Sequence, residues 1–269
     1  MQPIALHLLN VAIAGSLLLS PAAAPTDLLK PPPSANIEKG TTTTSLKGGA
    51  VRWKSVWTMM RGGGQGQRTV QFSEKGNGRY SGFAQEVRWD IETTWVSGDA
   101  FRPLRTKRTV TDMTGKPLLR ETKSFNFEQG TVDIERDDLS TGQKSRRSLK
   151  IPADTLSVDG IAAALRSLPF ERSRPVELHL LSNEPRLYEV SLEVRGRERV
   201  RTPAGQFECY KVEIVPALGV LKLFGFLVPN AYFWFTVDAP HYWVRYEGPE
   251  NGRGTPQIVM ELATFERSN

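Results

Sequence analysis

The sequence predicts a mostly β protein, in which a single antiparallel sheet is curved into an open half-barrel and one short helix packs on its concave face. From residue 51 onward, short runs of alternating apolar and polar residues are separated by turn residues. In residues 188–195 the apolar side chains fall on one parity and the polar or charged ones on the other. This alternation is typical of an antiparallel sheet with one solvated face.

One segment has the periodicity of a helix instead. Ile161, Leu165 and Leu168 are spaced i, i+4 and i+7, so they would share one face of a helix. Asp159 is placed to cap the start of this helix, and Pro169 is placed to end it. Because the apolar stripe of a helix must be covered and the other predicted elements are strands, we expect the helix on the concave face of the sheet.

Three regions follow one another along the chain. Residues 1–22 predict a signal peptide, because an apolar run from Ile4 to Leu19 is followed by small residues that suit cleavage before Ala23. An uncleaved N-terminal anchor is the alternative. Residues 23–50 are rich in Pro, Thr, Gly and Lys and predict a flexible linker, and residues 51–269 predict a single β domain. We therefore expect an exported protein of the periplasm or cell envelope.

The charge balance indicates the kind of partner. The chain has 35 Lys and Arg against 29 Asp and Glu, a formal net charge of +6 and a pI of about 9.5. Basic residues gather in residues 144–150 and 195–201. In an exported protein such clusters favour anionic lipid headgroups, an anionic envelope polymer or an acidic partner, and we expect no nucleic acid. A solvated sheet face is the alternative for each cluster, and the oligomeric state stays open.

Motifs of catalysis are scarce. The sequence has no Gly-x-Ser-x-Gly elbow, no His-Glu-x-x-His motif and a single cysteine, so we expect no metal and no cofactor. Catalytic carboxylates on separate strands would escape such a search, and His241, Asp238 and Arg245 are the groups that a hydrolase could bring together. Cys209 is interpreted as a buried strand residue, with a reactive thiol or an intermolecular disulfide as alternatives.

The second half of the chain resembles a family of secreted bacterial β-proteins known as a domain of unknown function. The resemblance covers residues 151–262 and rests on an Asp before a short helix that ends in Arg-x-Leu-Pro, a Pro-Ala-Gly-x-Phe turn, and a Trp-rich strand that ends in Asp before a strand with Arg. The positions that carry these motifs are Asp159, Arg166, Gly205, Phe207, Asp238 and Arg245. Residues 51–150 match only as generic strands. The resemblance implies a half-barrel similar to those of periplasmic lipoprotein carriers, and it brings no catalytic residues.

These motif positions also have local interpretations. Pro203 and Gly205 suit a tight turn into the strand that begins near Phe207. Asp238 suits a turn cap at the end of its strand. Arg166 could pair with an acid such as Asp238 beneath the sheet.

Residues 216–235 form the most unusual stretch, because they are apolar on both parities. Such a strand is either buried on both faces or lines an apolar cavity. In the second case this hairpin would form the wall of a lipid-sized cavity between sheet and helix, with these ligand-binding residues: Leu223, Phe224, Phe226, Leu227, Tyr232 and Trp234.

The sequence therefore predicts a basic, exported, non-enzymatic envelope protein that binds an apolar or amphiphilic, lipid-like ligand or an envelope partner. A structural or protein-interaction module without a small-molecule ligand is the first alternative. An unrecognised hydrolase is the second.

Overall fold

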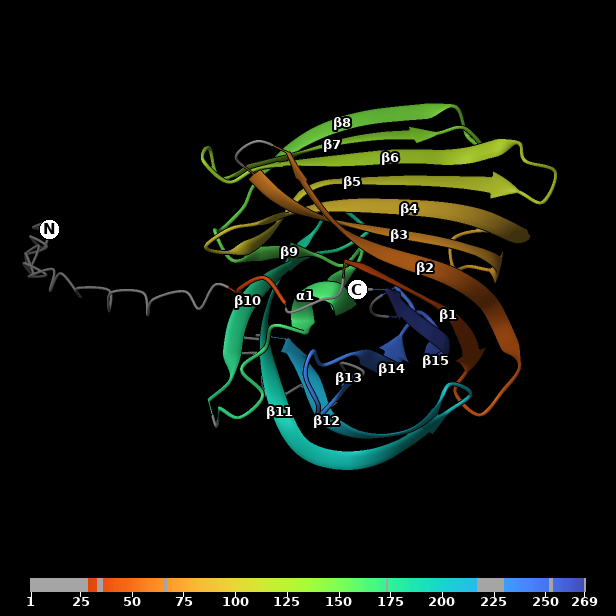
Figure 1. The fold of residues 1–269 in the computed structure, drawn as a ribbon. Helices are drawn as coiled ribbons and strands as arrows, with labels where there is room; N and C mark the ends of the chain where they lie inside the picture. Colours follow the sequence, from red (N-terminus) through yellow and green to blue (C-terminus); the bar gives the residue numbers. More distant parts are fainter. Residues whose placement is uncertain are drawn as a thin grey trace, which may run out of the picture.

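The structure is a computed structural model that describes residues 29–32, 36–64, 67–172, 174–216, 230–251 and 254–268. Within these residues the chain forms one sheet of fifteen strands and one short helix (Figure 1). The elements are β1 (Ile37–Leu46), β2 (Val51–Gly64), β3 (Gln67–Arg79), β4 (Glu86–Ser97), β5 (Phe101–Asp112), β6 (Pro117–Asn126), β7 (Thr131–Asp138), β8 (Gln143–Lys150), β9 (Thr155–Ser157), α1 (Ile161–Leu165), β10 (Val176–Leu181), β11 (Leu187–Thr202), β12 (Gly205–Pro216), β13 (Ala231–Thr236), β14 (Trp243–Pro249) and β15 (Gln257–Ser268). The predicted mostly β class, with a single open sheet and very little helix, is confirmed.

The order of the strands follows the chain outward from the centre of the sheet. β1 pairs with both β2 and β15, so the first and last strands lie side by side. From there β2 to β8 extend in one direction and β14 back to β9 in the other, and the sheet stays open between its edges β8 and β9. Neighbouring strands are antiparallel except for β9 and β10, which are parallel. We call β1–β8 the first wing and β9–β15 the second wing.

The sheet begins earlier than the sequence predicted. Ile37–Leu46 lie within the predicted linker of residues 23–50, yet they form the central strand β1, so that boundary was wrong. The residues that alternate into the buried face are polar or small: Glu38, Gly40, Thr42 and Thr44. Because hydrophobic periodicity depends on apolar side chains, it could not detect this strand.

The helix is shorter than predicted and is capped differently. α1 covers only Ile161–Leu165, and its N-cap is Gly160, at φ 71°, with no side-chain hydrogen bond to the helix. The predicted cap role of Asp159 was therefore wrong, because the Asp159 carboxylate instead contacts Arg108 and Lys123 on the first wing. The described part of the chain contains no helix with the length and hydropathy of a bilayer span.

The main hydrophobic core lies between the two wings. Buried side chains of α1 belong to the same cluster as residues of β2–β5 and of β10–β13, and Figure 1 shows α1 between the wings. Members of this cluster include Met59, Val70, Trp95, Phe101, Ala164, Leu165, Leu178, Val190, Val212 and Phe235. The short helix thus fills space that neither wing covers by itself.

Tryptophans pack against glycines on the neighbouring strand. Gly76 of β3 lies opposite Trp89 of β4, and a Cβ atom on Gly76 would lie 2.2 Å from Cζ2 of that ring. Gly40 of β1 lies opposite Trp57 of β2, where a Cβ atom would lie 2.8 Å from Cζ2. The missing side chains leave room for the indole rings on the crowded inner face of the curved sheet.

We expect Gly76→Ala to lower the free energy of unfolding by about 1–3 kcal/mol, the usual cost of overpacking, because Trp89 must move. Gly98→Ala is the control, since a Cβ atom there meets nothing within 4 Å. In urea denaturation the free energy of unfolding of the control variant should equal that of the wild type or exceed it slightly. Equal stability of the two variants would contradict this account of Gly76.

Candidate functional site

A cluster of buried charges lies on the inner face of β5 and β6. Arg108 of β5 and Lys123 of β6 are 5 % and 0 % exposed, and Glu121 of β6 is also buried. Glu121 is the register partner of Arg108, and its carboxylate lies 3.3 Å from both Lys123 Nζ and Arg136 Nη1 of β7. The first wing therefore presents two buried cations toward the second wing, with one buried carboxylate beside them.

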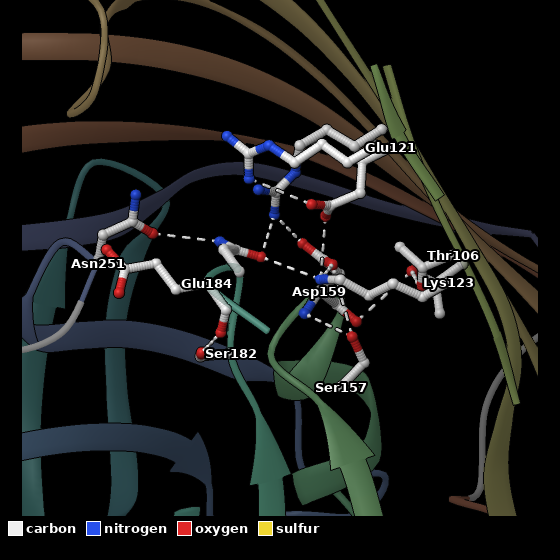
Figure 2. A network of polar contacts seen from close by, with 12 residues as sticks. Thr106, Glu121, Lys123, Ser157, Asp159, Ser182, Glu184 and Asn251 are labelled. Atoms are coloured by element: carbon white, nitrogen blue, oxygen red, sulfur yellow. Dashed lines mark hydrogen bonds and ion pairs between the residues drawn. The ribbon is translucent and has the colours of Figure 1, made fainter. Parts of the chain in front are cut away.

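Side chains from the second wing complete this cluster, as Figure 2 shows. Asp159, in the loop between β9 and α1, accepts a hydrogen bond from Arg108 through Oδ1 and lies 2.9 Å from Lys123 Nζ through Oδ2. The Asn183 side chain also accepts from Arg108, and it donates to Asn251 at 3.1 Å. We call Arg108, Lys123, Glu121, Asp159 and Asn183 the interwing network, because it joins the two wings.

Asp159 and Arg108 stabilise each other's charged forms. Burial by itself would raise the pKa of the Asp159 carboxyl, but attraction to Arg108 and then to Lys123 outweighs it, and the pKa lies well below its usual range. Burial would lower the pKa of Arg108, but Asp159 raises it overall. A carboxylate that is bound by two cations and has a depressed pKa is a weak base, so this geometry suits an electrostatic lock better than proton transfer.

A second buried ion pair holds the other end of α1. Arg166, the C-cap residue, places Nη1 2.6 Å from Oε2 of Glu38 and Nη2 3.2 Å from Oε1, which is a bidentate pair with the central strand β1. Its Nε donates to the carbonyl of Pro240, and its guanidinium lies 5.0 Å from the centre of the Tyr242 ring. We call Arg166 and Glu38 the helix tether.

This pairing corrects the predicted partner of Arg166. The partner is Glu38, not Asp238, and Glu38 lies in the segment that was predicted to be a linker. Asp238 lies in the turn after β13, where its backbone carbonyl accepts hydrogen bonds from the Thr236 hydroxyl and the His241 amide. The Thr236 hydroxyl also accepts from the amide of Tyr242, so Thr236 supplies the side-chain cap of this turn.

Glu74 and Tyr80 lie close to the interwing network. Burial raises the pKa of the Glu74 carboxyl, which bonds Ser55 and Trp89, and repulsion from Asp159 raises it further. Burial likewise raises the pKa of the Tyr80 hydroxyl.

Among the residues that the structure describes, no group of three or more His, Cys, Asp or Glu is arranged to hold a metal ion.

Two of the predicted ligand-binding residues point away from the helix. Tyr232 and Trp234 of β13 pack with Cys209, Val200 and Val244 in a cluster separate from the main core. The alternating residues Phe233 and Phe235 belong to the helix-side core instead. Tyr232 and Trp234 therefore do not line a space between the sheet and α1. The other four predicted residues, Leu223, Phe224, Phe226 and Leu227, lie outside the described residues and stay a prediction.

Cations fix the Trp234 ring on that far face. Lys211 Nζ lies 5.2 Å and the Arg245 guanidinium 5.4 Å from the ring, and the indole N–H donates to Glu198. Of the other motif residues, Gly205 has φ 136° as the first residue of β12, directly after the turn from β11, and Phe207 packs near Cys209. Asp159 and Arg166 thus attach the helix, Phe207 and Arg245 belong to the far face, and Gly205 and Asp238 lie at turns.

The three groups considered for a hydrolase do not converge. The His241 ring packs 4.6 Å from Phe170 of the main core, and its Nδ1 lies 2.9 Å from the Thr236 carbonyl. Arg245 lies beside Trp234 on the opposite face of the sheet, where it contacts Glu247 and Glu261.

The sequence analysis missed Arg108, Glu121 and Lys123. They could have been found as charged residues at positions that the strand alternation assigns to the inner face.

Comparison with known proteins identifies the family. A family described as "Protein of unknown function (DUF3108)" matches residues 41–262. The chain belongs to this family. The predicted resemblance is confirmed, and the match also includes residues 41–150, where the sequence had suggested only generic strands. No curated protein matches the chain.

Solved structures of low identity resemble the chain over most of its length. A candidate exported protein with a YmcC-like fold from Bacteroides fragilis has 11 % identity and a TM-score of 0.38, with 89 % of this chain and 99 % of that chain covered. A candidate lipoprotein from Parabacteroides distasonis has 9 % identity and a TM-score of 0.38, with 90 % and 100 % covered. A porin-like protein from Bacteroides uniformis has 11 % identity and a TM-score of 0.29, with 88 % and 100 % covered.

Replacing Asp159 by Asn should lower the free energy of unfolding by about 3–5 kcal/mol at pH 7, because two buried cations lose their counter-charge. The folded-state pKa of Asp159 is depressed, so its stabilisation is complete above the unfolded value of about 3.9 and is lost as the pH falls below it. Urea denaturation at pH 7 and below pH 4 should therefore show the difference from wild type shrinking in acid. Exposed Asp133 provides the control, since Asp133→Asn should change stability by less than about 0.5 kcal/mol.

Cys209 should be unreactive in the folded protein. It is fully buried in β12, and burial raises the pKa of its thiol to about 12, so the thiolate is scarce at pH 8. The interpretation as a structural strand residue is thereby confirmed. We expect iodoacetamide to leave the native protein unmodified at pH 8 and to alkylate it fully in guanidinium, as read by intact mass. Rapid alkylation of the native protein would contradict this expectation.

Proposed function

We propose that this is an exported, non-catalytic envelope protein that binds an apolar or amphiphilic, lipid-like ligand on the concave face of its curved sheet, beside α1. The observation that carries the proposal is an aromatic patch formed by Trp57, Phe72, Tyr242 and Phe265. Trp57 stacks 6.5 Å from Phe72 and 6.0 Å from Phe265, and Tyr242 lies 4.3 Å from Phe265. All four side chains are only partly buried, so ring surface reaches solvent.

The architecture of the sheet brings these rings together. Trp57 and Phe265 are register partners of the same glycine, Gly40 of β1, on its two sides. Because Gly40 has no side chain, the two rings approach each other across the central strand. Trp57 and Phe72 also pack against the main core, so the patch continues the apolar interior to the surface.

Polar groups at the patch favour an amphiphile over a purely apolar ligand. The indole N–H of Trp57 is buried and has no hydrogen-bond partner among the described residues. An unpaired buried donor costs about 1–3 kcal/mol, so a ligand that offers an acceptor there would gain affinity. A ligand with an apolar body and an oxygen-rich end has both features.

Electrostatics support a non-catalytic role. The charges of the interwing network and the helix tether are already paired within the protein, and the lowered pKa of Asp159 makes it a weak base. The groups considered for a hydrolase lie on different faces of the sheet. Export is proposed from the apolar run at the start of the sequence.

A structural or protein-interaction role is the second candidate. A cavity lined by Leu29, Phe101, Leu156 and Leu178 has a volume of about 10 Å³, which is room for no more than one water molecule. The ligand proposal therefore depends on the open aromatic patch and not on that enclosed space.

The test is native mass spectrometry with lipid extraction, on protein purified from its own cell envelope. We expect a reproducible co-purifying lipid that is retained by Val56→Ser and lost from Trp57→Ser. Val56 is the control because it neighbours Trp57 on β2, is 55 % exposed and faces the other side of the sheet. If Trp57→Ser fails to fold, as judged by near-ultraviolet circular dichroism, Phe265→Ser tests the same patch from β15. A wild-type protein without bound lipid would favour the second candidate.

A further inference from the structure

The two edges of the sheet are very different. β9 has three residues, all buried, and pairs with β10. β8 has eight residues, of which seven are exposed and one, Leu149, is partly buried. One side of β8 pairs with β7, and its other side pairs with no strand of the described chain. β8 therefore presents a full-length row of backbone donors and acceptors to solvent.

β8 is also strongly basic. Its eight residues include four cations, Lys144, Arg146, Arg147 and Lys150, and no acid. Lys144 and Arg146 lie 3.6 Å from Asp137 and Glu135 of β7, and both cations are about three-quarters exposed (76 % and 75 %). Such long, exposed contacts contribute little.

The other basic cluster, at residues 195–201, is different. Arg195, Arg197 and Arg199 each contact a carboxylate at 2.5–2.6 Å: Glu213, Glu171 and Glu208 respectively. Those three arginines have close partners within the protein, whereas on β8 only Lys144 and Arg146 form ion pairs with described residues. The two clusters look alike in sequence, but three of the four arginines at residues 195–201 are paired at short distance, whereas β8 has four cations and only two long, exposed contacts.

Charges alternate across the strands that end at β8. On the outer face, Arg120 of β6 is opposite Asp137 of β7, which is opposite Lys144 of β8. Opposite charges on directly facing residues stabilise a strand pair, and like charges destabilise it. The next strand in this ladder should therefore carry carboxylates, and a second copy of β8 would place cation against cation.

We propose that β8 is a docking edge for an acidic, extended segment of a partner protein, which adds to the sheet as an antiparallel strand. Main-chain hydrogen bonds would supply affinity, and carboxylates opposite Lys144 and Arg146, which share the outer face, would supply specificity. On the inner face, Leu149 lies beside Val132 and offers a place for an apolar side chain. The proposal is independent of the lipid-like ligand, since β8 contributes nothing to the aromatic patch.

Charged edge strands also serve to keep edges apart, and the experiment separates the two roles. The full chain is titrated with a capped ten-residue peptide of alternating glutamate and valine, and binding is followed by calorimetry. We expect saturable binding that is weakened about tenfold in the double variant Lys144→Gln, Arg146→Gln, which removes both cations that would face the glutamates on the outer face. The matched control, Arg199→Gln with Arg201→Gln, removes the same charge from exposed positions of β11 and should bind as the wild type does.

A second peptide tests the pairing itself. It has the same sequence with alternate backbone nitrogens methylated, which keeps the charge but prevents strand addition, and we expect it to bind at least about tenfold more weakly. Equal affinity for the methylated peptide, or an equal loss in the control variant, would reduce the effect to diffuse attraction and overturn the proposal. Phosphatidylglycerol vesicles are titrated in the same way. If the protein binds these vesicles but not the unmethylated peptide, or binds neither, the proposal is overturned.

Discussion

Buried ion pairs at both ends of one short segment determine how the two halves of the sheet meet. Asp159 reaches Arg108 and Lys123 on the first wing, and Arg166 reaches Glu38 on the central strand. The helix between them has only five residues, and a helix this short is not stable by itself. Its position therefore depends on these contacts and on its apolar packing, and separating the wings would leave buried charges without partners.

This arrangement gives a physical reason for the order of residues around the helix. A negative side chain before α1 and a positive one at its end attach it to different strands, so the segment can dock in one orientation only. Leu168, just beyond α1, is buried in the same core. The Asp, Arg and Leu of the family motif thus attach α1 to the sheet and the core. The family resemblance had likewise implied no catalytic role for them.

Sequence periodicity was sufficient for the class of the fold and insufficient for its long-range contacts. The strands with apolar faces were predictable, whereas β1 was missed because its buried face is made of Thr, Gly and Glu. Asp159 looked like a helix cap because a cap is a local feature, but its partners lie 51 and 36 residues away. The face of Trp234 was equally undetermined, because β13 is apolar on both parities and only the fold places α1 beside Phe233 and Phe235.

In an open sheet, apolar side chains on the faces must be covered and backbone groups at the two edges must find hydrogen-bond partners. In this chain some of these groups are covered or paired and others are not. α1 packs in the main core, the charges of the interwing network are paired, and the β9 edge is buried. Two places are open to a partner: the aromatic patch, where the Trp57 indole N–H is one of several buried polar atoms without a partner among the described residues, and the edge of β8. An unpaired donor and an unpaired strand edge both gain free energy from a bound partner. Because neither place includes the interwing network or the helix tether, a partner could bind at either one without breaking the contacts that hold the wings together.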